Sequence, residues 1–236
     1  MERRVQLICA WCGPVFLILF MVGYWFVAGL LPPPSANDSA QHIALFYRDH
    51  QNQIRAGMTI CLCAAPFMVP FVALITYQLI RSNPKLAPFA YTQLACGLFV
   101  VMIFTGMTIL VSVAAFRPDR SPAVTQGLND LAWTIFVWPF SFVLGEYVPV
   151  ALAVLMDTSD DPVYPKWVGW FELAMAALFL PAAPMIFYHS GAFSWEGFWP
   201  FWLGFAAFAG WFWVMFAMML RAINRQPREP AVESTA

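Results

Sequence analysis

The stretch LICAWCGPVFLILFMVGYWFVAGLL, residues 7–31, decides the fold class of this chain. It contains no charged residue, and a helix of about 20 apolar residues is long enough to cross the hydrocarbon core of a bilayer. Arg3 and Arg4 precede it, as basic residues precede a secretory leader, but its apolar run exceeds the roughly 7–15 residues that a leader has. We therefore interpret it as an uncleaved first transmembrane helix.

The composition of the whole chain agrees with this interpretation. Hydrophobic residues make up 61% and charged residues only 11%, against about 25% charged residues in soluble domains. The sequence predicts an all-α, polytopic membrane bundle in one transmembrane domain, residues 1–220, followed by a cytoplasmic tail, residues 221–236. The predicted transmembrane helices are residues 7–31, 56–80, 87–116, 131–156, 167–188 and 198–220.

The basic residues of the loops predict the orientation of the bundle. Cytoplasmic loops carry an excess of Lys and Arg, and eight such residues fall on the side of the N-terminus against four on the other side. We expect N-in/C-in topology, in a bacterial inner (plasma) membrane. The inner residues are Arg3, Arg4, Arg81, Lys85, Lys166, Arg221, Arg225 and Arg228, and the outer ones are Arg48, Arg55, Arg117 and Arg120.

The longest predicted outer connection is residues 32–55. It opens on three prolines, which resist helix formation, and Ser35 with Asp38 three residues later resembles a helix start. Apolar and aromatic residues then recur at helical spacing, for example Ile43 and Tyr47. We expect a short amphipathic helix that lies on the outer interface or packs over the mouth of the bundle. The alternative is a connection without a role beyond packing.

The positions of the prolines suggest a 3+3 inverted repeat. Pro14 and Pro139 fall early in the first and fourth helices, and Pro66 and Pro181 interrupt the second and fifth. Paired helix interruptions in two inverted halves are typical of transporter binding sites. The 19 prolines of the chain also make such pairings easy to find by chance.

The motif FVLGEYVP, residues 142–149, places Glu146 deep in the fourth predicted helix, about 16 Å from its inner end. A carboxyl group at that depth must be protonated, paired or hydrated, and such groups mark proton and ion pathways. Pro149 cannot donate a hydrogen bond to the Gly145 carbonyl, which can then help to coordinate a cation or water. We predict a proton-binding or ligand-binding site at Gly145, Glu146 and Tyr147. The alternative is a protonated Glu146 hydrogen-bonded to a neighbouring helix.

Glu172 is the second candidate, about 8 Å from the inner end of the fifth predicted helix. The fourth and fifth helices are joined by a short loop, so we expect them to be antiparallel neighbours with Glu146 and Glu172 about 8 Å apart in depth. Water in a polar cavity could bridge them. The alternative for Glu172 is a structural role, with its side chain reaching the interface or meeting Lys166.

Other groups that could carry chemistry are sparse. The three histidines fall on the predicted outer side, without the i, i+4 spacing of metal ligands, so we expect no metal site. The five cysteines lie in apolar segments, where cysteine behaves mostly as a small apolar residue, and the Cys9–Cys12 pair follows no strand. No phosphate-binding glycine loop or nucleophilic triad is visible. We expect no cofactor.

Three functions fit these observations. The first is a small proton-coupled carrier for an ion or a lipophilic small molecule, based on Glu146, Glu172 and the proline-interrupted helices. The second is a non-catalytic accessory or scaffold subunit of a membrane complex. The third is a lipid-modifying membrane enzyme, which lacks a visible nucleophile, so we lean against an enzyme. The expected partners are the lipid bilayer and other membrane subunits or further copies of the chain; a net charge of −1 offers no basic surface for nucleic acid.

Overall fold

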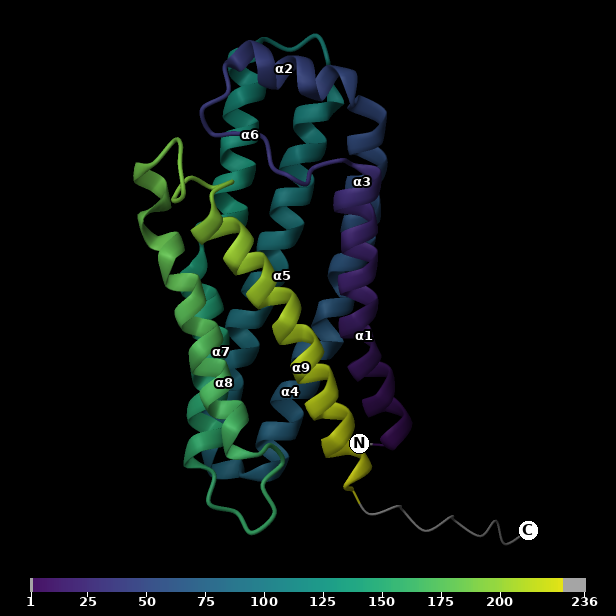
Figure 1. Ribbon diagram of the computed structural model, residues 1–236. Coiled ribbons are helices and arrows are strands. Elements are labelled where there is room, and N and C mark those ends of the chain that lie inside the picture. The colour runs from purple at the N-terminus through teal and green to yellow at the C-terminus, as the bar shows by residue number, and fades with distance from the viewer. Residues whose placement is uncertain (1, 227–236) are drawn as a thin grey trace, which may run out of the picture.

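The computed structural model describes residues 2–226, and this part of the chain is helical with no strand. It holds six helices long and apolar enough to cross a membrane, which makes the chain an integral membrane protein (Figure 1). The spans are α1 with η1 (Arg3–Met21, Val22–Val27), α3 with η2 and α4 (Gln51–Ala64, Ala65–Phe67, Met68–Ser82), η3 with α5 (Pro84–Leu86, Ala87–Phe116), α6 with α7 (Pro122–Val137, Phe140–Met156), α8 with η4 (Lys166–Phe179, Leu180–Phe187) and η5 with α9 (Phe198–Leu203, Gly204–Asn224).

Prolines interrupt three of the six spans, because proline lacks the backbone N–H of the helical hydrogen-bond ladder. Pro66 lies in η2, a short, tighter helical turn between α3 and α4. Trp138 and Pro139 separate α6 from α7, and Pro181 with Pro184 gives the end of the fifth span the tighter winding of η4. Pro149, in contrast, lies within α7 without dividing it.

The spans pack around α5, which contacts α3, α4, α6 and α7. α1 packs against α4 and α9, and α8 packs against α7. Two glycines allow η1 and α3 to approach closely, because a Cβ atom added to Gly23 would lie 2.6 Å from the Gly57 carbonyl oxygen. Such small residues at helix contacts are typical of membrane bundles, where packing replaces the hydrophobic effect as the source of association.

The short helix α2 (Ala40–Asp49) lies across one end of the bundle, which we call the α2 end (Figure 1). Of the two predicted placements of the amphipathic helix, the structure shows packing over the bundle, with Ile43 and Tyr47 buried against its neighbours. The predicted helix start at Ser35 is wrong. Ser39 caps α2 by accepting a hydrogen bond from the His42 N–H at 3.3 Å, and Ser35 instead forms a turn with Asp38.

Polar residues extend the fourth span beyond its predicted start at residue 131, because they bond to α2 and to the loop before it. The span begins at Pro122. In the added turns, Gln126 donates to the Asp38 carbonyl at 3.1 Å, and the buried Asn129 accepts a hydrogen bond from the Tyr47 hydroxyl at 3.1 Å. Similarly, the second span begins at Gln51 rather than at residue 56, directly after α2.

The first and last helices meet at the opposite end, which we call the terminal end. Arg3 donates to the Asn224 side chain at 2.7 Å, and Gln6 donates to the side chain of Gln226 at 2.8 Å. α9 continues to Asn224, past the predicted limit at residue 220, because its last turn packs against α1 through these contacts. The remainder of the predicted tail, residues 227–236, lies outside the described residues.

Candidate functional site

Glu146 lies in the middle of the bundle, between α7 and α5, with 1% of its surface exposed. Gly97 of α5 provides the space for its carboxyl group, because a Cβ atom at that position would lie 2.8 Å from Glu146 Oε1. Oε1 is buried and has no hydrogen-bond partner in the described part of the chain. An ionisable side chain in this state within a membrane protein is a functional candidate by default.

A small polar network lies beside this carboxyl group. Gln93, one turn from Gly97 on α5, interacts with the Glu146 carboxyl group without reaching the geometry of a hydrogen bond. Its Oε1 accepts a hydrogen bond from the Thr76 hydroxyl of α4 at 2.8 Å, but its Nε2 is buried without a partner within residues 2–226. Gln93 Nε2 and Glu146 Oε1 thus form an incompletely bonded donor and acceptor in an otherwise apolar region.

Glu172 lies in α8 and is fully buried, but its environment differs from that of Glu146. The indole Nε1 of Trp211, on α9, donates to both carboxyl oxygens at 3.0 and 2.9 Å. The contact with Lys166, one of the structural alternatives for Glu172, is not formed. Lys166 lies at the first turn of α8, where its Nζ donates to the last carbonyls of α7, for example that of Leu155 at 2.8 Å.

Tyr147 connects the surroundings of the two carboxyl groups. Its ring stacks on the indole of Trp211 with centroids 4.8 Å apart, and it contacts the Phe179 ring edge-on at 5.9 Å. The Tyr147 hydroxyl is buried and unpartnered among the described residues, and it interacts electrostatically with both Glu146 and Glu172. The structure therefore brings Glu146, Tyr147 and Glu172 into one buried cluster.

Gly145 contributes to helix packing, and the coordinating role predicted for its carbonyl stays a prediction. A Cβ atom at Gly145 would lie 2.6 Å from Cys96 Sγ, so this glycine allows α7 to approach α5. The structure assigns it to helix packing beside the cluster.

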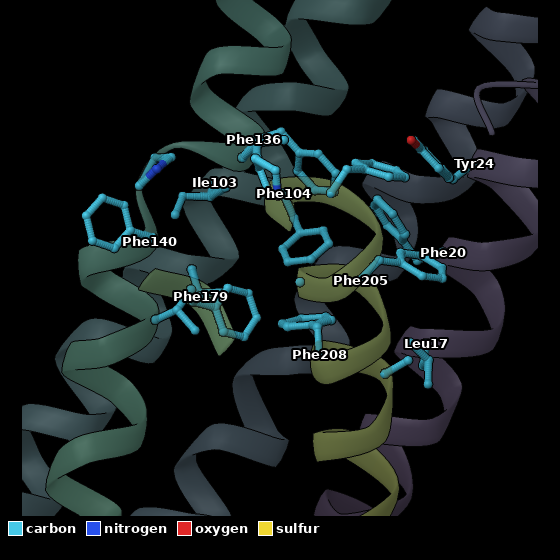
Figure 2. Close-up of a pocket in the computed structure, with 18 of the residues that line it drawn as sticks. Leu17, Phe20, Tyr24, Ile103, Phe104, Phe136, Phe140, Phe179, Phe205 and Phe208 are labelled. Carbon is cyan, nitrogen blue, oxygen red and sulfur yellow. The ribbon is translucent and has the colours of Figure 1, made fainter. Parts of the chain in front are cut away.

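An apolar cavity of about 90 Å³ lies next to the cluster, on the side toward α6 and the α2 end. Nine of its lining residues are phenylalanines, contributed by α1, α5, α6, α7, α8, η5 and α9, and none is charged. Figure 2 shows their rings gathered around a common space between the helices. Val100 and Val143 line the cavity one helical turn from Gly97 and Glu146, so they separate it from the carboxyl group by about 5 Å along the helix axes.

Several other polar residues of the spans lie outside this cluster. Thr105 and Thr108 bond to carbonyls of their own helix at 2.9 and 2.7 Å, and Tyr91 is 59% exposed. Gln78 donates to Gln6 at 2.9 Å near the terminal end. Among residues 2–226, no group of three His, Cys, Asp or Glu side chains is placed to hold a metal ion.

Sequence reasoning missed two residues of the cluster, Thr76 and Trp211. Thr76 is one of several hydroxyl residues in apolar helices, and Trp211 lies in the aromatic run FAGWFW. Neither has a sequence signal that separates it from its neighbours, because its role depends on which helix faces it. Comparison of the chain with protein families, curated proteins and solved structures gave no match.

Proposed function

We propose that the chain is a small proton-coupled carrier in which Glu146 takes up and releases the coupling proton. One observation carries this proposal: the Glu146 carboxyl group is buried within the fourth apolar span, and its Oε1 has no hydrogen-bond partner among the described residues. A purely structural carboxyl group would be expected to have its oxygens satisfied, because an unsatisfied buried polar atom costs about 1–3 kcal/mol. An incompletely bonded one is available to a proton or a cation.

Glu172 supports the proposal by contrast. Both of its oxygens accept the indole N–H of Trp211, so the structure occupies this carboxyl group with a fixed partner. We assign Glu172 and Trp211 to the positioning of Tyr147, whose ring stacks on that indole. Glu146 is therefore the carboxyl group that exchanges a proton, and Glu172 fixes the position of the Trp211 and Tyr147 rings beside it.

The interrupted helices supply places where the bundle can bend. Breaks at Pro66 and Pro139 divide the second and fourth spans, and the end of the fifth span is wound more tightly around Pro181. Carriers commonly combine discontinuous helices with a binding site near the middle of the membrane. The pairing of these breaks as an inverted repeat, and the N-in/C-in orientation, remain predictions.

Proton flux in reconstituted vesicles tests the proposal. Purified protein would be placed in liposomes loaded with the pH dye pyranine, and sodium, potassium or p-xylene would be added under an imposed pH gradient. We expect one of these additions to produce a proton flux that Glu146→Gln abolishes. The exposed Glu2→Gln serves as the matched control and should retain the flux. Infrared spectroscopy should also show a carboxyl band that changes with pH in the wild type and is missing in Glu146→Gln.

Two results would overturn the proposal. One is a flux of equal size in the wild type and in Glu146→Gln, which would remove Glu146 from the mechanism. The other is the absence of any flux together with co-purification of another membrane protein at fixed stoichiometry, which would favour the accessory subunit.

A further inference from the structure

The cavity beside the proton site has the chemistry of a binding site for one class of molecule. Its lining includes nine phenylalanines and no charged residue, and Tyr24 is the one residue with a polar side chain. Burying a charge in such surroundings without a partner is very costly, so an ionic ligand is disfavoured. Uncharged hydrocarbon groups are favoured, because aromatic rings offer both faces and edges to a neighbouring ring.

The size of the cavity limits its occupant further. At about 90 Å³ it is smaller than the apolar cavities of about 150 Å³ that take up benzene or xenon, and it is of the same order. Its lining residues come from eight different elements, among them Phe104 of α5 and Phe208 of α9, whose rings are 5.1 Å apart. A ligand with the cross-section of one aromatic ring therefore fits with small rotations of these rings.

The residues that line the cavity also contact the surroundings of Glu146. Val143 of α7 and Val100 of α5 form its floor, one turn from Glu146 and from the Gly97 that makes room for it. Phe179 lines the cavity and contacts the Tyr147 ring. A molecule bound in the cavity therefore contacts α5 and α7 beside Glu146, and also the Phe179 ring that packs against Tyr147.

From these observations we infer that the aromatic cavity is a binding site for an uncharged lipophile about the size of one aromatic ring, and that this lipophile is the substrate class of the carrier. The second part of the inference rests on the proposed function. The first part, the binding site, does not.

Gly204 provides a sharp test of the binding site, because it lines the cavity at the start of α9. A Cβ atom at Gly204 would meet Phe179 at 3.5 Å, an ordinary contact, so the Gly204→Ala variant should fold. The longer side chain of Gly204→Leu would extend into the cavity and fill it. Gly210 on the same helix is exposed, with nothing within 4 Å of an added Cβ, so Gly210→Leu is the matched control.

The probe is the small photolabel phenyl(trifluoromethyl)diazirine, applied to the full-length purified protein, with excess p-xylene as competitor. Mass spectrometry would locate the labelled residues. We expect labelling of Phe205 and Phe208 that p-xylene suppresses by about tenfold, lost in Gly204→Leu and kept in Gly210→Leu. Labelling at Phe26, which is 72% exposed and does not line the cavity, should not respond to the competitor.

The outcomes separate the two proposals. Labelling of the cavity that p-xylene does not suppress, or that is equal in both leucine variants, would overturn the binding site. If Gly204→Leu does not fold, Phe208→Ala replaces it: the enlarged cavity should accept a two-ring competitor that the wild type rejects, and unchanged selectivity would overturn the site. Competable labelling without Glu146-dependent flux would leave the binding site standing and refute the carrier. A Glu146-dependent flux without competable labelling would support the carrier and refute the binding site.

Discussion

The contact between Trp211 and Glu172 predicts a measurable coupling between α9 and α8. A single indole N–H donates to both carboxyl oxygens, at 3.0 and 2.9 Å, so the arrangement counts as one shared hydrogen bond. Trp211→Phe removes this donor and also the packing of the larger ring. We expect the lost bond to cost about 1 kcal/mol, near the upper part of the range measured for hydrogen bonds between transmembrane helices. The lost packing should cost about 2 kcal/mol.

A double-mutant cycle separates the two contributions. Glu172→Met replaces the carboxyl group by an apolar side chain of similar length, so Trp211→Phe should cost only the packing part, about 2 kcal/mol, in that background. The coupling free energy between the two positions should therefore be about 1 kcal/mol. Trp213→Phe on the same helix is the control, because Trp213 is 48% exposed and should cost much less.

Unfolding in detergent can be followed with a thiol-reactive dye in a background that keeps Cys61 and replaces the other four cysteines by alanine. Cys61 is fully buried in the folded protein and becomes reactive only on unfolding, whereas Cys63 is exposed. The free energy of unfolding would be measured for the wild type, both single variants and the double variant. If Trp211→Phe costs the same in both backgrounds to within about 0.3 kcal/mol, the hydrogen bond contributes nothing. Glu172 would then not hold the indole on which Tyr147 stacks.

Two further predictions concern the loop between α7 and α8. Burial alone would raise the pKa of the Asp157 carboxyl group, but hydrogen bonds from Ser82 and Ser159 outweigh it and hold this pKa below its ordinary value. This stabilisation is present above the unfolded pKa, about 3.9, and is lost as the pH falls through the folded one. The melting temperature should therefore drop in that acidic window in the wild type but less in Asp157→Asn; parallel pH curves would contradict this. Lys166→Met removes the ammonium group that bonds to the last carbonyls of α7 and should cost about 0.5–1 kcal/mol by thermal unfolding. Lys85→Met, at an exposed position of the same end, should cost less, and an equal loss in both would refute this role for Lys166.

The candidate site shows how far a sequence can locate function in a membrane protein. Glu146 was identifiable because a carboxyl group in an apolar span of this length stands out against its neighbours. The burial of Glu146 against Gly97 and beside Gln93 could not be identified from the sequence. Gly97 and Gln93 lie on a different helix, and no single segment of sequence indicates which helices are neighbours. The same reason explains why the sequence did not indicate that Glu172 accepts the indole N–H of Trp211.

The sequence by itself determined the class of the protein and its six apolar spans. These properties follow from the local composition and from the fixed rise of a helix per residue, which can both be evaluated along the sequence. Only the tertiary structure decided that Glu146 is left incompletely bonded, that Glu172 is held by Trp211 and that phenylalanines from seven elements line a cavity. Each of these depends on which faces of distant helices meet, and in a bilayer that choice is made by close packing rather than by hydrophobic pattern.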